Sequence, residues 1–194
     1  MPTKRKPGPF STEIRHVSEC AFQRAIILGK YSIVNGKRIN WIDIELPVDK
    51  AESARGKCID LIGKDSDGNY VICELKFRRK YRDNGGPIEA TKQLKEYFEL
   101  INSNIDYLKG LQHDNATESI NWDDVAKGKT RLFVVANKDY FESWCVRKHT
   151  DLPDDDGVEY YAVNVNQNEF SDQKGTLLKY TPIMPDEGFE WVAV

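Results

Sequence analysis

The sequence predicts an α/β fold, because strand-like and helical segments alternate along the chain. Two runs rich in Val, Ile, Leu, Tyr and Phe, KCIDLIG (57–63) and NYVICELKF (69–77), flank the turn-forming stretch KDSDGN and indicate a β-hairpin. An amphipathic helix follows from Ile88 to about Asn102, with an apolar stripe and a charged face. A β-rich run from Thr130 to Ala136 then continues the sheet.

The remaining helices and strands are predicted from less regular patterns of apolar and turn-forming residues. Ser11 can cap a first helix that runs to about Lys30, since apolar residues recur there at helical spacing. The stretch INWIDIEL is read as a strand. Later segments are expected to be a short helix near 121–126, a helix at 137–147, a strand at 159–165 and extended pieces with turns at 177–194.

Length and composition favour one domain. The chain has 194 residues, 40% of them hydrophobic, which is enough for a sizeable core. Residues 1–10 carry Lys and Arg between prolines and are expected to form a flexible basic arm, so the domain is assigned to 11–194. No run approaches the roughly 20 apolar residues of a membrane span, and no signal peptide is visible, so a cytoplasmic location without membrane attachment is expected.

Cysteine and histidine give little support for other chemistries. The four cysteines and three histidines are scattered, without C-x-x-C spacing or a Cys/His cluster. The cysteines are therefore interpreted as reduced core residues, and neither a zinc site nor a Ser/His/Asp triad is favoured.

The predicted hairpin carries a group of chemically active side chains. Side chains alternate between the faces of a strand, so Glu74 and Lys76 share one face with Ile72, and Asp60 interrupts an apolar row of the first strand. An ionised carboxylate in such a row is costly unless it is paired or binds a metal. Two carboxylates can hold a hard divalent cation, and a lysine beside them can orient or deprotonate a water. Alternatively, Glu74 and Lys76 simply form an ion pair.

The whole block resembles the active-site core of the PD-(D/E)XK nuclease superfamily. That pattern has an acidic helix, a strand with Asp, a strand ending in E-x-K, and a helix with Gln and Tyr. The matching residues lie between Ser11 and Asn102, with Cys58-Ile59 standing before the Asp where the name-giving Pro would be. The resemblance implies a restriction-endonuclease-like three-layer core, in which helices flank a central mixed β-sheet. The residues that match the pattern are Glu19, Asp60, Glu74, Leu75, Lys76, Gln93 and Tyr97.

The resemblance also implies roles for these residues. Asp60 and Glu74 would bind Mg²⁺ or Mn²⁺ directly, together with the Leu75 carbonyl, and Lys76 would orient the attacking water. Gln93 would steady the lysine or a phosphate.

The last metal ligand and the role of Tyr97 stay open at this point. Glu19 is favoured as an additional or water-mediated ligand, and Glu45 is the alternative donor. Tyr97 would contact the substrate phosphate or belong to the core.

A basic run begins at the candidate lysine. The stretch KFRRKYR contributes side chains that could grip phosphate, although such runs are often only solvated loops. The net charge of −3 argues against coating nucleic acid by bulk electrostatics. The predicted nucleic-acid contacts are therefore local: Arg78, Arg79, Lys80 and Arg82, with Tyr97.

The favoured function is a metal-dependent endonuclease that hydrolyses DNA phosphodiester bonds. The first alternative is a non-catalytic nucleic-acid-binding or assembly module on the same fold, and the second is a structural or partner-binding domain. The carboxy terminus FEWVAV fits either a homodimer interface or an edge strand that packs on its own core. The sequence does not separate DNA from RNA as the substrate.

Overall fold

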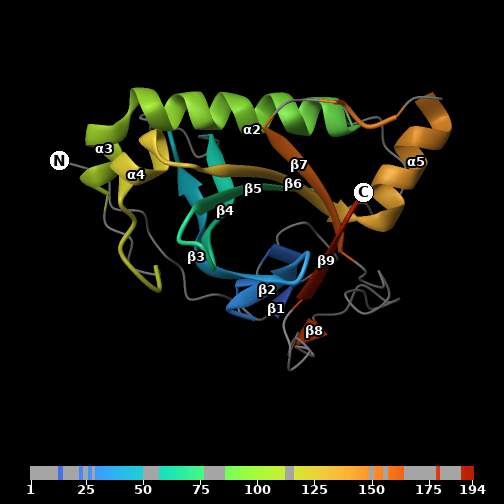
Figure 1. Ribbon diagram of the computed structural model, residues 1–194, viewed down its shortest axis with the longest axis horizontal. Helices are drawn as coiled ribbons and strands as arrows, with labels where there is room; N and C mark the ends of the chain where they lie inside the picture. The colour runs from blue at the N-terminus through green and yellow to red at the C-terminus, as the bar shows by residue number, and fades with distance from the viewer. Residues whose placement is uncertain are drawn as a thin grey trace.

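A seven-stranded mixed β-sheet that closes on itself forms the centre of the fold in the computed structural model (Figure 1). The structure describes residues 13–14, 22–23, 26–27, 29–49, 57–76, 86–111, 116–148, 151–154, 157–163, 178–179 and 189–194. The strands are β1 (Glu13–Ile14), β2 (Tyr31–Val34), β3 (Lys37–Pro47), β4 (Cys58–Asp65), β5 (Tyr70–Lys76), β6 (Arg131–Asn137), β7 (Val158–Val163), β8 (Leu178–Lys179) and β9 (Phe189–Ala193). The helices are α2 (Gly86–Ser103), α3 (Ile105–Lys109), α4 (Trp122–Lys127) and α5 (Lys138–Lys148).

The expectation of a three-layer core, in which helices flank a central mixed β-sheet, was wrong. The strand order is β2-β3-β4-β5-β6-β7-β9, and the sheet closes because β9 pairs in parallel with β2 and antiparallel with β7. The long helix α2 lies across the outside of this barrel. Helices α3 and α4 lie near one end of α2, and α5 lies near its other end (Figure 1). A closed sheet has an interior, so the inner face of its strands packs on the other strands of the barrel and on the helical residues Phe22, Ile26 and Ile27.

Two apolar clusters correspond to the two faces of the sheet. The inner cluster contains Val71, Cys73 and Leu75 of β5 and includes Trp41, which stacks on Trp191 with ring centroids 5.2 Å apart. The helix-side cluster includes residues of α2, α3, α4 and α5 that pack on the outer face. Burial on both faces explains why β5 and β6 are almost continuously apolar in sequence.

Most of the predicted elements are confirmed, with one clear exception. The hairpin, the strand INWIDIEL, the α2 helix, the short helix α4, α5 and β7 all form close to their expected bounds. The first helix does not begin at Ser11 as expected, because Glu13 and Ile14 form β1 and pair with β8. Residues 22–23 and 26–27 are helical. A strand pairing with residues about 165 positions away along the chain has overridden the local helical pattern at this point.

The glycine at the start of α2 is required by its backbone and by its neighbour. Gly86 has a φ of +63°, and a Cβ atom there would overlap the indole ring of Trp144 in α5. This close approach joins α2 to α5. None of the helices formed by the described residues is long and apolar enough to span a membrane.

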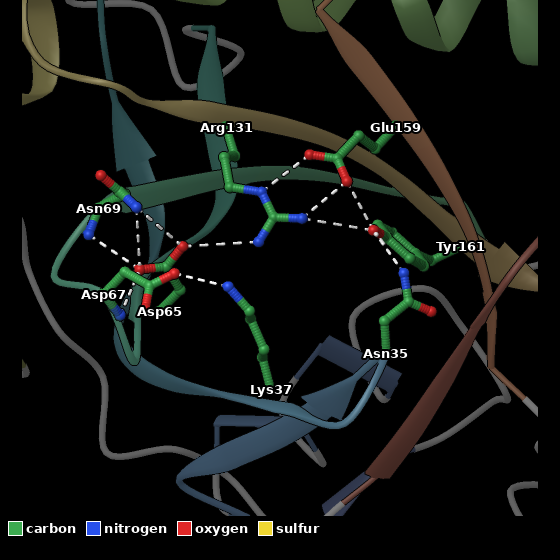
Figure 2. Close-up of polar contacts among 8 residues, drawn as sticks. All are labelled: Asn35, Lys37, Asp65, Asp67, Asn69, Arg131, Glu159 and Tyr161. Atoms are coloured by element: carbon green, nitrogen blue, oxygen red, sulfur yellow. Dashed lines mark hydrogen bonds and ion pairs between the residues drawn. The ribbon is translucent and has the colours of Figure 1, made fainter.

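A polar network ties together the turns and strand starts at one end of the barrel (Figure 2). It connects the β2–β3 turn, the β4–β5 turn and the first residues of β6 and β7. The Asp65 carboxylate also shapes its own turn, because it accepts hydrogen bonds from the backbone N–H groups of Asp67 and Asn69. The network residues are Asn35, Lys37, Asp65, Asp67, Asn69, Arg131, Glu159 and Tyr161.

Arg131 is the centre of this network. Its guanidinium donates two hydrogen bonds to the Glu159 carboxylate, at 2.8 and 2.7 Å, and lies 3.5 Å from an oxygen of Asp65. The Tyr161 hydroxyl donates to Glu159 at 2.6 Å. The Asp65 side chain is only 1% exposed, so its charge depends on these partners.

The two carboxyl groups ionise more readily here than in an unfolded chain. Burial alone would raise the pKa of Asp65, but hydrogen bonds from Asn69 and Asp67 and the charge of Arg131 outweigh it, so the pKa is lowered. Burial is likewise outweighed at Glu159, whose pKa is lowered by hydrogen bonds from Arg131 and Tyr161. Both carboxylates are therefore stabilised as anions in the folded protein.

We predict that Arg131→Met lowers the free energy of unfolding by about 2 kcal/mol, because it removes a hydrogen-bonded cation from the buried Asp65 and from Glu159. Chemical denaturation measures the change. The matched control is Lys37→Met, since Lys37 pairs with Asp67 in an exposed ion pair and its loss is expected to change little. Equal effects of the two substitutions would contradict the role given to Arg131.

We also predict that the network makes the fold sensitive to acid. A carboxyl group whose pKa is lowered by folding stabilises the protein fully above its unfolded pKa, and this stability is lost as the pH falls through the folded pKa. The stability difference between wild type and Arg131→Met should therefore narrow progressively below about pH 5. Denaturation at a series of pH values measures it, and a difference that stays constant would argue against the lowered pKa values of Asp65 and Glu159.

Candidate active site

The end of β5 places a carboxylate and a lysine on the helix side of the sheet. Ile72 belongs to the helix-side cluster, whereas Val71, Cys73 and Leu75 belong to the inner cluster, which confirms the predicted alternation along this strand. Glu74 and Lys76 therefore share the face of Ile72. The Lys76 ammonium lies 2.5 Å from Glu74 Oε1, and the side chains are 25% and 2% exposed, respectively.

Asp60 lies in the neighbouring strand β4, close to the E-x-K motif. The pairing of β4 with β5 ends at Leu61 and Cys73, so Asp60 and Glu74 are the residues just beyond the last pair. Asp60 Oδ2 accepts a hydrogen bond of 2.7 Å from the backbone N–H of Leu75. The Asp60 carboxylate thus reaches over the main chain of β5 at the E-x-K motif.

The predicted alternation along the first hairpin strand is wrong at Asp60. Ile59 and Leu61 were expected on one face, but Ile59 belongs to the helix-side cluster and Leu61 to the inner cluster. Their partners in β3, Leu46 and Ile44, change sides in the same way.

A distortion of β3 accompanies this change of face. Glu45 lies between Ile44 and Leu46 and has a φ of +50°, which is uncommon for a non-glycine residue. In both strands, therefore, the residues before and after this position point to opposite faces of the sheet. The position is occupied by Asp60 in β4 and by Glu45 in β3.

A residue that the sequence analysis did not single out holds the main chain of Asp60 at this change of face. The Gln23 side chain donates a hydrogen bond of 2.6 Å from Nε2 to the main-chain carbonyl of Asp60. Gln23 is 3% exposed and lies in a helical stretch beside Phe22 and Ile26 of the inner cluster. A buried glutamine on an otherwise apolar helix face was the available signal.

Helix α2 brings its polar pair close to the same group. Gln93 Nε2 donates to the Tyr97 hydroxyl at 2.6 Å. Its predicted contact with the lysine or with a phosphate stays a prediction. Burial raises the pKa of Tyr97, and the negative charges of Glu74 and Asp60 raise it further. The hydrogen bond from Gln93 and the charge of Lys76 oppose this effect without cancelling it. Tyr97 is also part of the helix-side cluster, so it combines a core position with proximity to both carboxylates.

Several predicted site residues cannot be placed. Glu19 and the basic side chains Arg78, Arg79, Lys80 and Arg82 lie outside the described residues. Glu45, the alternative to Glu19, lies in β3 next to the step at Asp60 and is exposed. Within the described part of the chain, no three His, Cys, Asp or Glu side chains converge on a common metal position.

The donor set is nevertheless compatible with a hard divalent cation. Asp60 and Glu74 supply carboxylate oxygens on adjacent strands, and Leu75, which follows Glu74 in β5, supplies a carbonyl oxygen. Such oxygen ligands suit Mg²⁺, which retains several waters and commonly uses one or two carboxylates. The Lys76 ammonium neutralises part of the negative charge beside Glu74.

A known endonuclease family matches the segment that carries these residues. Residues 46–121 match the family model described as "Endonuclease NucS C-terminal domain". This range includes β4, β5 and α2. The resemblance to nucleases predicted from the sequence is thus supported at the level of an endonuclease family.

Individual relatives match shorter parts of the chain. Endonuclease NucS of Thermococcus kodakarensis is 44% identical over 43 residues, which are 22% of this chain and 15% of that protein. A repair endonuclease from Pyrococcus abyssi is a structural neighbour with 22% identity and a TM-score of 0.30, covering 63% of this chain and 37% of its own. An EndoMS–dsDNA complex gives 22% identity and a TM-score of 0.25, with 60% and 38% coverage.

We predict that Glu74→Gln lowers the pKa of Tyr97 relative to wild type, because the substitution removes a negative charge that disfavours the tyrosinate. ¹³C NMR titration of labelled tyrosines measures this, with the Tyr97 signal assigned by its loss in Tyr97→Phe. Glu89→Gln, on the exposed face of α2, serves as the control and should leave the pKa unchanged. An unchanged pKa in Glu74→Gln would place Tyr97 away from this carboxylate.

Proposed function

We propose that this chain is a metal-dependent endonuclease that hydrolyses phosphodiester bonds of DNA. The observation that carries the proposal is the meeting of Asp60, Glu74 and Lys76 at the ends of two adjacent strands. The match of this segment to an endonuclease family supports the same class of activity. The chain covers only 15% of the curated relative, so the activity of that whole protein is part of the proposal.

The ligands of the cation are proposed to be Asp60, Glu74 and the Leu75 carbonyl. A Mg²⁺ or Mn²⁺ ion bound there would polarise the scissile phosphate and lower the pKa of a coordinated water. Glu19 or Glu45 is proposed as a further ligand, direct or through water.

Lys76 is proposed to orient the attacking water. Its ammonium already lies beside Glu74 and is partly exposed, so it can reach a solvent molecule at the edge of the site. Gln93 acts through Tyr97, because its side-chain amide donates to the phenol. Tyr97 then contributes a hydroxyl near the carboxylates, where it can donate to a phosphate oxygen.

The substrate is proposed to be a nucleic acid, in line with the expected DNA, because a basic stretch follows directly on Lys76. The residues Arg78, Arg79, Lys80 and Arg82 continue the chain from the candidate site, and each can contact a backbone phosphate. Contacts of this kind position a nucleic acid without reading its sequence.

We predict that Asp60→Asn and Lys76→Met each abolish Mg²⁺-dependent nicking of supercoiled plasmid. Asp60→Asn keeps an oxygen that can accept from Leu75 while it removes the negative charge that the cation needs. Lys76→Met keeps most of the side-chain volume but lacks the ammonium. The matched control is Asp106→Asn, which removes an exposed carboxylate of α3 and should leave nicking unchanged.

Circular dichroism establishes that each variant is folded before nicking is compared. Full activity in either Asp60→Asn or Lys76→Met would contradict the proposed roles. Nicking that continues in the presence of excess EDTA would contradict the dependence on a metal ion.

A second candidate function is a non-catalytic nucleic-acid-binding module. The close Lys76–Glu74 pair favours it, because in that pairing the lysine and the carboxylate satisfy each other's charge. Binding that falls steeply with salt, without metal-dependent cleavage by the wild-type protein, would support this function over the first.

A further inference from the structure

We infer that Gln23 is a positioning residue for Asp60, and that its side-chain amide sets the affinity of the carboxylate pair for a divalent cation. The inference rests on the metal site proposed above. Gln23 Nε2 donates to the Asp60 carbonyl at 2.6 Å, while the Asp60 carboxylate accepts from Leu75 at 2.7 Å. Asp60 is therefore held from both its main chain and its side chain.

The need for such a support follows from the change of face at this residue. The β3–β4 register pairs Leu61 with Ile44 and Ile59 with Leu46, and these two pairs belong to different apolar clusters. The paired residues of β4 and β5 end at Leu61 and Cys73. Asp60 thus lies where regular strand geometry is interrupted, and the Gln23 hydrogen bond fixes the direction of its peptide group.

The orientation of Gln23 is itself fixed by packing. The residue is 3% exposed, and its neighbours Phe22 and Ile26 are fully buried in the inner cluster. A helix anchored in this way cannot easily move its amide away from β4. The contact also links two segments 37 residues apart in the chain.

An amide suits this position because it donates a hydrogen bond without adding a charge. A lysine or arginine there would supply a cation next to Asp60, where it would compete with a divalent ion for the carboxylates. An acidic side chain would lack the donor when ionised. Gln23 supports the ligand and leaves the negative charge of Asp60 and Glu74 available for the metal.

Loss of an outer hydrogen bond to a metal ligand typically weakens metal affinity by about 10- to 100-fold. We therefore expect Gln23→Met, which keeps the side-chain volume but has no donor, to weaken Mn²⁺ binding by about tenfold or more. Isothermal titration of the whole chain with MnCl₂, in the absence of DNA, measures the affinity directly. Gln23→Leu is a second variant of different shape that also lacks the donor.

The matched control is Asn104→Leu. Asn104 also uses a side-chain amide to donate to a main-chain carbonyl, that of Val48 just after β3, at 3.1 Å, but it lies at the start of α3. Its loss should lower the melting temperature, as the loss of Gln23 should, and leave the Mn²⁺ affinity unchanged. A general loss of stability would lower the affinity in all three variants alike.

The outcomes separate this inference from the proposed function. Weaker Mn²⁺ binding in the two Gln23 variants, with wild-type affinity in Asn104→Leu, supports the positioning role. Equal Mn²⁺ affinity in wild type and in a folded Gln23 variant overturns the inference but leaves the proposed metal site standing. The same holds if Asn104→Leu loses as much Mn²⁺ affinity as the Gln23 variants. Absence of Mn²⁺ binding by the wild type overturns the proposed metal site and this inference with it.

Discussion

The antiparallel pairing of β4 with β5 is the constraint on which the candidate site depends. A turn shaped by the Asp65 carboxylate starts the pairing, and its register ends at Leu61 and Cys73, next to Asp60 and Glu74. The Asp60 carboxylate then binds the backbone of Leu75, within the E-x-K motif itself. A shift of this register by one residue would turn the side chains of β5 to the opposite faces and separate Glu74 and Lys76 from α2. The hairpin therefore sets the geometry, and the rest of the fold holds the hairpin in place.

The two ends of the hairpin in the closed sheet are held by different groups of residues. The Arg131 network fastens the turn end of the hairpin to β6 and β7, and the buried Asp65 carboxylate joins that turn to Arg131 (Figure 2). At the other end, Gln23 and the α2 helix surround the carboxylates. The network that stabilises the fold and the candidate site therefore lie at opposite ends of the hairpin. Changes in the network should act on the site through the fold, whereas changes at Gln23 should act on Asp60 directly.

Local patterns in the sequence were sufficient to predict the hairpin, α2 and the face that Glu74 and Lys76 share. Alternation with a period of two and a cluster of turn-forming residues act over a few positions, and the structure follows them along β5. The closure of the barrel could not be predicted in this way, because it depends on β9 pairing with β2 across more than 150 residues. The change of face at Asp60 was missed for a related reason. It coincides with the positive φ of Glu45 on the neighbouring strand, and nothing in the residues around Asp60 encodes that conformation.

The central claim is that Asp60 and Glu74 bind one divalent cation together. A crystal structure of the chain with Mn²⁺, using anomalous scattering to locate the metal, tests it most directly. We predict a metal peak at about 2.0–2.2 Å from oxygens of both Asp60 and Glu74, with the Leu75 carbonyl as a further ligand and Lys76 displaced from Glu74. A structure at saturating Mn²⁺ without a peak there, in which Lys76 remains paired with Glu74, would contradict the account.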